Sequence, residues 1–271
     1  MNSLIYYYTG TGNSLWASRF IADALKGTRI EHMKSYSQVP GKAIKAIGFV
    51  FPVHMWGIPR PVVEFLTKFT RDLKAELKTG TEKKSDRYYF ACALNAGEVA
   101  ESLVQLDRIL SGIGAKLSLG VSLAMPSNYI PWGGPGPEES LQVIYKKARE
   151  KLDRFCENIK IQESSPPEKG SLKEKLLYSG IIYTLAFPQI HGMDKNFTVD
   201  SSCTSCGICE RICPASNISL EEGKPVWHSH CEQCMACIQW CPTQSIQYGE
   251  KTRAYPRYHH PEIRVSNMYM R

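Results

Sequence analysis

The sequence has 271 residues, of which 43% are hydrophobic, so it can bury one large core or two moderate ones and is far from a disordered composition. It contains no run of roughly 18 to 20 apolar residues, and its first residues lack a signal-peptide pattern, so we expect a cytoplasmic protein without a membrane span. The formal net charge of +7 is only a weak sign of acidic partners, and we expect no nucleic acid partner.

The first 160 residues alternate apolar runs with segments of helical periodicity. Strands are expected at 4–8, 29–32, 47–53, 88–94 and 117–123, with 29–32 as the weakest candidate. Between them, apolar residues recur at helical spacing. Strands that alternate with helices and carry few polar residues predict an α/β fold with a doubly wound, five-stranded parallel sheet.

This pattern breaks at residues 162–175, where prolines, serines and charged residues are typical of a linker. The apolar stretch 176–190 is too short and too interrupted to span a membrane, and we expect it to pack between two domains. The expected division is a first domain at 1–162, a linker and interdomain packing segment at 163–195, and a cysteine-rich domain with a basic tail at 196–271.

The cysteine-rich region contains the pattern C-x2-C-x2-C-x3-C-P twice, beginning at Cys203 and at Cys231. The three closely spaced thiolates of such a motif bind three irons of a [4Fe–4S] cluster, and in two-cluster ferredoxins the fourth ligand comes from the other motif. The predicted ligand sets are therefore Cys203, Cys206, Cys209 and Cys241 for one cluster, and Cys231, Cys234, Cys237 and Cys213 for the other.

Zinc sites and disulfides are the alternative uses of these cysteines. Zinc ribbons usually offer two separated pairs of ligands, and disulfide frameworks are typical of small secreted chains, so the repeated motif favours a small α+β bicluster ferredoxin domain. Cys92 and Cys156 lie outside the motifs, and we expect them to be small apolar groups in a strand and on a helix.

The stretch TGTGNS follows the first expected strand. Gly10 and Gly12 give the start of a dinucleotide fingerprint, but Leu15 replaces its third glycine, and no lysine follows as in a Walker loop. A helix that begins here directs N–H groups and its positive dipole end towards an anion. An ordinary capped helix start is the alternative. We expect a site for one terminal phosphate, formed by Thr9, Gly10, Thr11, Gly12, Asn13 and Ser14.

This stretch resembles the phosphate loop of flavodoxins, whose sheet has the strand order 2-1-3-4-5 and binds FMN between strands 1 and 3. The resemblance implies FMN in the first domain and two ring-binding loops, which correspond to residues 51–61 and 94–98. The candidate ring contacts in these loops are Pro52, His54, Met55, Trp56, Gly57, Asn95, Ala96 and Gly97.

Residues 125–134 follow the fifth expected strand, and there Tyr129 or Trp132 is expected to cover the ring. A place in the core between the domains is the alternative for Trp56. The chain as a whole, including its ending RYHHPEI, resembles the ferredoxin–flavodoxin fusion proteins called the EFR1 family. That resemblance implies electron transfer and names no substrate.

A flavin holds one or two electrons and each cluster passes one. We therefore favour an electron carrier that passes single electrons between two [4Fe–4S] clusters and FMN, with a ferredoxin-like donor or an oxidoreductase acceptor as partner. An FMN-dependent reductase of a small quinone or nitro compound is the alternative, with His54 as its candidate proton donor, although a lone loop histidine is more often a bystander. A redox sensor is a third hypothesis, without a recognised effector module.

The basic tail, residues 251–271, is expected either to steer an acidic redox partner or to pack onto the ferredoxin domain. Exposed clusters of this kind tolerate oxygen poorly, which favours an anaerobic or reducing cytoplasm.

Overall fold

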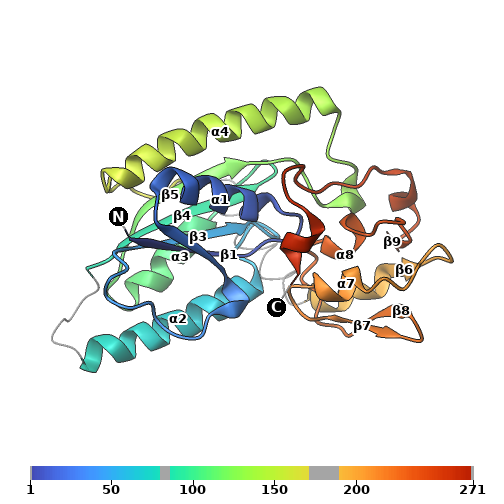
Figure 1. Cartoon of the computed structure of the whole chain (residues 1–271), viewed down its shortest axis with the longest axis horizontal. Coiled ribbons are helices and arrows are strands. Elements are labelled where there is room, and N and C mark those ends of the chain that lie inside the picture. The colour runs from blue at the N-terminus through green and yellow to red at the C-terminus, as the bar shows by residue number, and fades with distance from the viewer. Residues whose placement is uncertain (1, 80–85, 171–188, 270–271) are drawn as a thin grey trace.

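A computed structural model describes residues 2–79, 86–170 and 189–269 of the chain. It consists of an α/β part and a smaller cysteine-rich part that lie side by side (Figure 1). Most of the apolar stretch 176–190 lies outside the described residues, so its expected packing between the domains stays a prediction. Of the described helices, none combines the length and the apolar character that crossing a bilayer requires.

The α/β part is built on one parallel sheet whose strand order is β2-β1-β3-β4-β5. This order confirms the flavodoxin-like fold expected from the sequence. Each end of an expected strand lies within one residue of the observed end. The strands are β1 (Ser3–Tyr7), β2 (Thr28–His32), β3 (Ala46–Pro52), β4 (Tyr88–Asn95) and β5 (Leu117–Ala124).

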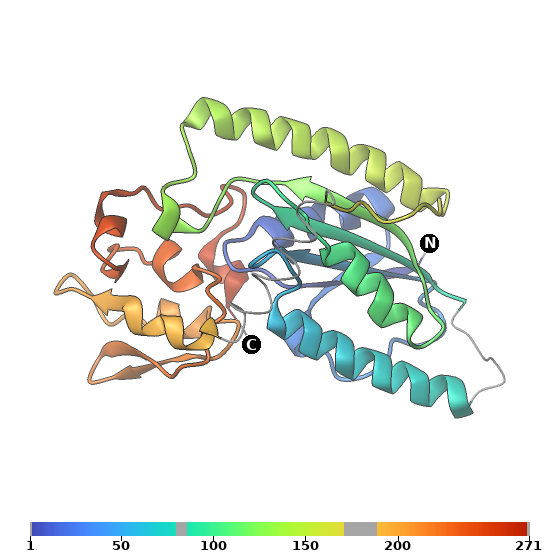
Figure 2. The same ribbon diagram turned by 180° about the vertical axis from the view of Figure 1, so that it is seen from behind.

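Helices cover both faces of the sheet, which explains why its strands are apolar on both sides (Figures 1 and 2). One face packs Ile5 and Phe90 against α1 and α4, and the other packs Leu4 and Phe49 against α2 and α3. Successive residues such as Leu4 and Ile5 belong to different cores because side chains alternate along a strand. The helices are α1 (Asn13–Leu25), α2 (Arg60–Thr79), α3 (Ser102–Ser111) and α4 (Glu138–Lys160).

The cysteine-rich part consists of two short antiparallel ladders, β6 with β9 and β7 with β8, and two helices of one turn. Its internal repeat is visible in the backbone, because each short helix follows a left-handed residue, Gly207 in one motif and Met235 in the other. The elements are β6 (Phe197–Val199), α7 (Ile208–Arg211), β7 (Ile218–Glu221), β8 (Lys224–Trp227), α8 (Ala236–Gln239) and β9 (Ile246–Tyr248). Single 3-10 turns are η1 (Met33–Ser35), η2 (Ile130–Trp132), η5 (His191–Asn196), η6 (Lys251–Ala254) and η7 (Val265–Met268).

Residues 163–170, expected as the start of a linker, run along the outer edge of β5. The Ser165 and Glu168 N–H groups donate to the carbonyls of Ser118 and Gly120, both at 2.9 Å. A Cβ at Gly120 would lie 2.9 Å from that of Pro167, so the glycine permits this close approach. This half of the expected linker therefore covers a sheet edge that would otherwise be open to pairing.

The C-terminal tail packs against the cysteine-rich part, as expected, and also against the α/β part. His260 stacks on Trp16 of α1 at a ring-centroid distance of 4.6 Å, and His259 stacks on Trp240 at 4.1 Å. Apolar residues of the cysteine-rich part and the tail, including Ile263, belong to the same core as α1 and α4. The tail thus joins the two parts, since its rings have partners on both.

Two of the basic residues of the tail have intramolecular partners. Arg253 forms an ion pair with Asp200 at 3.0 Å, and Arg257 donates to the carbonyls of Thr252 and Ile246, each at 3.0 Å. These two cations stabilise the tail, so the hypothesis that the tail steers an acidic partner rests on its other basic residues.

Candidate functional site

Eight cysteines line two cavities in the cysteine-rich part, and none of them forms a disulfide. Each cavity takes three cysteines from one motif and the last cysteine from the other motif. Among the described residues, no group of three or more His, Cys, Asp or Glu side chains is placed to hold a single metal ion. The outer set is Cys203, Cys206, Cys209 and Cys241, and the inner set is Cys213, Cys231, Cys234 and Cys237.

The two sets differ in their surroundings. Cys206 of the outer set is exposed, whereas in the inner set Cys237 is buried and Cys234 is partly buried, and burial raises the pKa values of both inner thiols well above the usual range. The neighbouring cysteines of the inner set raise these pKa values further. Thiols with such raised pKa values are neutral at pH 7, and they would become thiolates with a cationic group between them, which the irons of a cluster would supply.

A pocket of about 390 Å³ lies at the carboxyl ends of the strands, where the α/β part meets the cysteine-rich part. It is the switch point at which ligands bind in open α/β sheets. Gly12 and Gly57 do not line it, although the sequence analysis placed them in the flavin site. The other predicted contacts that line it are Thr9, Gly10, Thr11, Asn13, Ser14, Pro52, His54, Met55, Trp56, Asn95, Ala96, Gly97 and Tyr129.

The loop between β1 and α1 forms one end of the pocket, with Thr9, Thr11 and Ser14 buried. Gly12 has a left-handed φ of 95° and its N–H donates to the Thr9 hydroxyl at 3.1 Å, which closes the turn. A Cβ at Gly12 would lie 3.1 Å from that of Ile263 in the tail. Gly12 therefore contributes to the shape of the loop without lining the pocket. The first N–H groups of α1 have no intrahelical acceptor and can donate to an anion.

The loop after β3 forms a tight turn beside the pocket. His54 and Gly57 exchange two backbone hydrogen bonds of 3.1 and 3.0 Å. Met55 and Trp56 between them have φ values of 46° and 62°, left-handed conformations that cost free energy for residues other than glycine. His54, Met55 and Trp56 line the pocket, whereas Gly57, whose N–H is used within this turn, does not.

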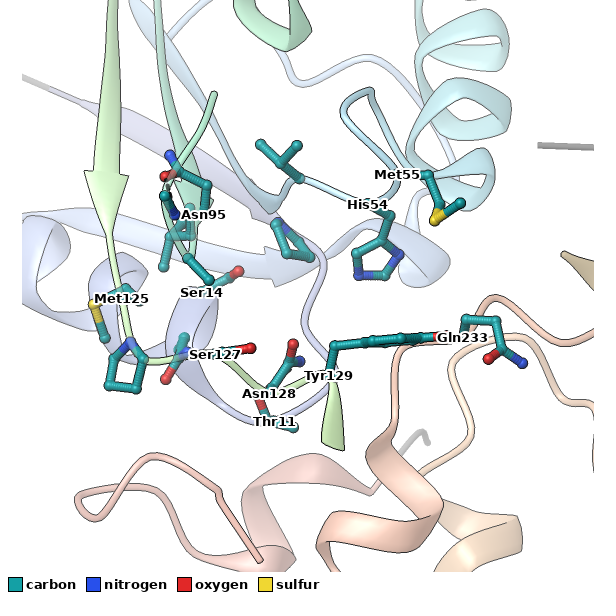
Figure 3. A pocket seen from close by; sticks show the side chains of 18 of the residues that line it. Thr11, Ser14, His54, Met55, Asn95, Met125, Ser127, Asn128, Tyr129 and Gln233 are labelled. Atoms are coloured by element: carbon teal, nitrogen blue, oxygen red, sulfur yellow. Dashed lines mark hydrogen bonds between the residues drawn. The ribbon is translucent and has the colours of Figure 1, made fainter. Parts of the chain in front are cut away.

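His54 is partly exposed, but its Nδ1 atom is buried and has no hydrogen-bond partner among the described residues. In Figure 3, His54 and Tyr129 lie on opposite sides of the pocket. Burial lowers the pKa of His54 to about 4, against an opposing hydrogen bond to the Glu232 backbone. The imidazole is therefore neutral at pH 7.

Three other side chains of the pocket already have partners. The Asn95 amide donates to the Ser122 hydroxyl at 2.7 Å and accepts from the Gly97 N–H at 3.1 Å. Asn128, after β5, donates to the Thr11 hydroxyl at 3.2 Å. Asn128 is not among the residues predicted from the sequence, although its position after the carboxyl end of β5 could have indicated it.

Two further lining residues, Glu232 and Gln233, come from the second cysteine motif. Glu232 is 6% exposed, accepts from His191 at 3.0 Å and lies 3.9 Å from Arg60. Burial raises the pKa of Glu232 to about 7, although Arg60 acts in the opposite direction. No sequence signal marks these two residues, because only the docking of the two parts brings them to the pocket.

Aromatic rings border the open side of the pocket. Trp132 is 74% exposed and lies 4.8 Å from the Tyr129 ring and 6.4 Å from the Trp56 ring. Trp56 thus contributes to this border, which lies near the junction of the two parts.

Comparison with protein families shows that residues 202–246 match the 4Fe-4S dicluster domain. This part of the chain is therefore similar to iron–sulfur domains of the ferredoxin type. A search of curated proteins found no match.

Among solved structures, the rubredoxin oxygen:oxidoreductase of the anaerobe Desulfovibrio gigas is 14% identical, with a TM-score of 0.38, over 60% of this chain and 37% of that one. A flavodoxin from the domain Archaea is 12% identical, with a TM-score of 0.37, over 58% of this chain and 99% of that one. The flavodoxin of Streptococcus pneumoniae TIGR4 is 13% identical, with a TM-score of 0.39, over 59% of this chain and 97% of that one. The present chain thus spans little more than a third of the Desulfovibrio gigas protein.

Proposed function

We propose that the protein is an electron-transfer iron–sulfur flavoprotein, with a [4Fe–4S] cluster in each cysteine set and FMN in the pocket. FMN supplies a centre that takes one or two electrons, and each cluster supplies a centre that takes one. The residues of the chain hold these centres in a fixed order. That order is the outer set, the inner set and the pocket.

The observation that supports this proposal is the contact between the inner set and the pocket. A Cβ at Gly10 would lie 2.6 Å from the backbone oxygen of Cys234, so the phosphate loop and a cluster ligand are in direct contact. Glu232 and Gln233, between Cys231 and Cys234, form part of the pocket wall. The inner set is therefore the one that exchanges electrons with a flavin, and the outer set is the one accessible to a partner.

The pocket has groups that fit each part of FMN. The loop between β1 and α1 offers the hydroxyls of Thr9, Thr11 and Ser14, together with N–H groups at a helix start, for the phosphate. The ring would lie between the His54 and Tyr129 sides of the pocket. Backbone groups of 95–97 would meet its pyrimidine edge.

The partner, in this proposal, is a redox protein of the cytoplasm, either a ferredoxin-like donor or an oxidoreductase acceptor. It would dock beside the outer set, where Cys206 is exposed. The combination of the two parts in this order also supports membership in the EFR1 family of fusion proteins.

A second candidate is an FMN-dependent reductase of a small quinone or nitro compound. The aromatic border formed by Trp56, Tyr129 and Trp132 favours it, since flat acceptors stack on such rings. Its proposed proton donor, His54, is neutral at pH 7 because burial lowers its pKa to about 4. A neutral imidazole is a weak acid, so this observation favours the carrier.

Stepwise anaerobic reduction of the reconstituted holoprotein tests the proposal, with the flavin absorption followed against electrons added. Two separate one-electron changes of the flavin would support a carrier matched to single-electron partners. A single two-electron change would favour the reductase and direct a screen of small acceptors. A holoprotein that retains no FMN after gel filtration would refute both.

A further inference from the structure

The phosphate loop receives hydrogen bonds from the cysteine-rich part and from the tail, through two residues that do not line the pocket. The indole Nε1–H of Trp240 donates to the Gly10 carbonyl at 3.1 Å, and the His260 N–H donates to the Thr11 carbonyl at 2.9 Å. Both donors are buried. The loop is therefore oriented by residues that lie more than two hundred positions away in the sequence.

The orientation of a peptide plane follows from the direction of its carbonyl. In a trans peptide the C=O and the following N–H point in opposite directions. Because the Gly10 carbonyl points to Trp240, the Thr11 N–H of the same peptide points away from the cysteine-rich part. Among the described residues, no acceptor takes a hydrogen bond from that Thr11 N–H.

Three side-chain acceptors of the loop are also occupied. The Thr9 hydroxyl accepts from the Gly12 N–H, the Thr11 hydroxyl accepts from Asn128, and the Asn13 side chain accepts from the Tyr258 hydroxyl at 2.7 Å. A hydroxyl that accepts one hydrogen bond still has its proton to donate. With these acceptors engaged, the hydroxyl protons of Thr9 and Thr11 remain available as donors to an anion.

We infer that Trp240 is a positioning residue for the phosphate site and that, together with the His260 N–H, it couples anion binding in the first domain to docking of the cysteine-rich part. The inference rests on the proposed function, since the anion is taken to be the phosphate of FMN. Trp240 precedes Cys241 of the outer set, and its ring stacks on His259. One residue thus contacts the phosphate loop while belonging to the iron–sulfur motif.

The coupling is reciprocal, because two linked equilibria change each other by the same factor. If docking sets the Thr11 N–H for the phosphate, then bound FMN strengthens the contacts of Trp240 and His260 with the loop. The inner set is then held against the pocket most firmly when flavin is present to exchange electrons with it.

The variant Trp240→Phe removes the indole donor and keeps an aromatic ring for the stack on His259. One net hydrogen bond corresponds to about a three- to tenfold change in an equilibrium constant, so we expect the dissociation constant of FMN to rise by that factor. Titration of FMN into FMN-free, cluster-loaded protein, followed by flavin fluorescence, measures this dissociation constant. Tyr88→Phe is the matched control, because it removes a single ring donor to the Glu163 carbonyl at the amino end of β4.

A second variant approaches the same contact from the loop. In Gly10→Ala the new Cβ would meet the Cys234 backbone, so the two parts must move apart, and we expect weaker FMN binding with unchanged iron content. Amide hydrogen exchange of residues 258–263, with and without FMN, then tests reciprocity. We expect FMN to slow exchange there.

The outcomes separate this inference from the proposed function. Failure of the wild-type protein to bind FMN would refute the proposed function. If the wild-type protein binds FMN and both Trp240→Phe and Gly10→Ala bind it as tightly as the control Tyr88→Phe, the coupling alone is refuted. Exchange at 258–263 that does not respond to FMN would refute its reciprocity.

Discussion

The exchange of ligands between the two cysteine motifs can be tested by counting iron. If each cavity holds one [4Fe–4S] cluster, the fully loaded protein contains about eight irons, and loss of one cluster leaves about four. Cys206 and Cys241 line the same cavity although they belong to different motifs, whereas Cys206 and Cys213 share a motif and line different cavities. Double variants therefore distinguish exchanged ligands from ligands that stay within one motif.

With exchanged ligands, Cys206→Ala combined with Cys241→Ala removes two ligands of one cluster and leaves about four irons. Cys206→Ala combined with Cys213→Ala removes one ligand from each cluster and leaves few irons or none. Without exchange, the two double variants would give the opposite results. The expected iron content of each double variant follows from which cysteines line each cavity.

The assay is anaerobic reconstitution, followed by iron analysis and low-temperature electron paramagnetic resonance of the reduced protein. Cys92→Ala is the control, because Cys92 is buried in β4 and lines neither cysteine cavity. It should keep about eight irons. A Cys206→Ala/Cys213→Ala protein that retains a full cluster would refute the assignment of Cys213 to the inner set.

Three further predictions concern buried groups. The Tyr8 hydroxyl is buried near the inner set and lacks a partner among the described residues. Because a hydrogen-bond donor beside a cluster raises its reduction potential, Tyr8→Phe should lower the potential of the inner cluster in a redox titration, whereas Tyr6→Phe should not. Burial lowers the pKa of His260 to about 3, so the unfolded chain binds a proton below about pH 6.5 that the folded chain does not, and stability falls as the pH is lowered. In denaturant titrations between pH 6.5 and 5.5, His260→Phe should reduce that fall by about 1 kcal/mol, and an unchanged pH dependence would contradict the buried neutral ring. A Cβ at Gly48 would lie 2.4 Å from the Phe90 ring, so Gly48→Ala should cost about 1 to 3 kcal/mol in unfolding free energy, whereas Gly41→Ala, in open space, should cost much less.

Local patterns were sufficient for much of the fold. The five strands could be located to within a residue because runs such as 47–53 are apolar on both faces and end at turn-forming residues. The cysteine motifs carry their chemistry in their spacing, which is the reason that residues 202–246 are recognisable without tertiary structure. The loop 9–14 likewise follows a strand directly, so its place at the sheet edge is a local matter.

The pocket itself was decided by tertiary structure. Glu232 and Gln233 line it, the His260 N–H binds the phosphate loop, and residues 163–170 pair with β5, all without a signal in their own segments. Gly10 illustrates the contributions of both local sequence and tertiary structure. Its sequence context indicates a phosphate loop, but the need for a glycine there comes from Cys234, whose backbone leaves no room for a Cβ. Such contacts join residues far apart in the chain, and they depend on how two separately patterned parts dock, which no local periodicity or motif spacing encodes.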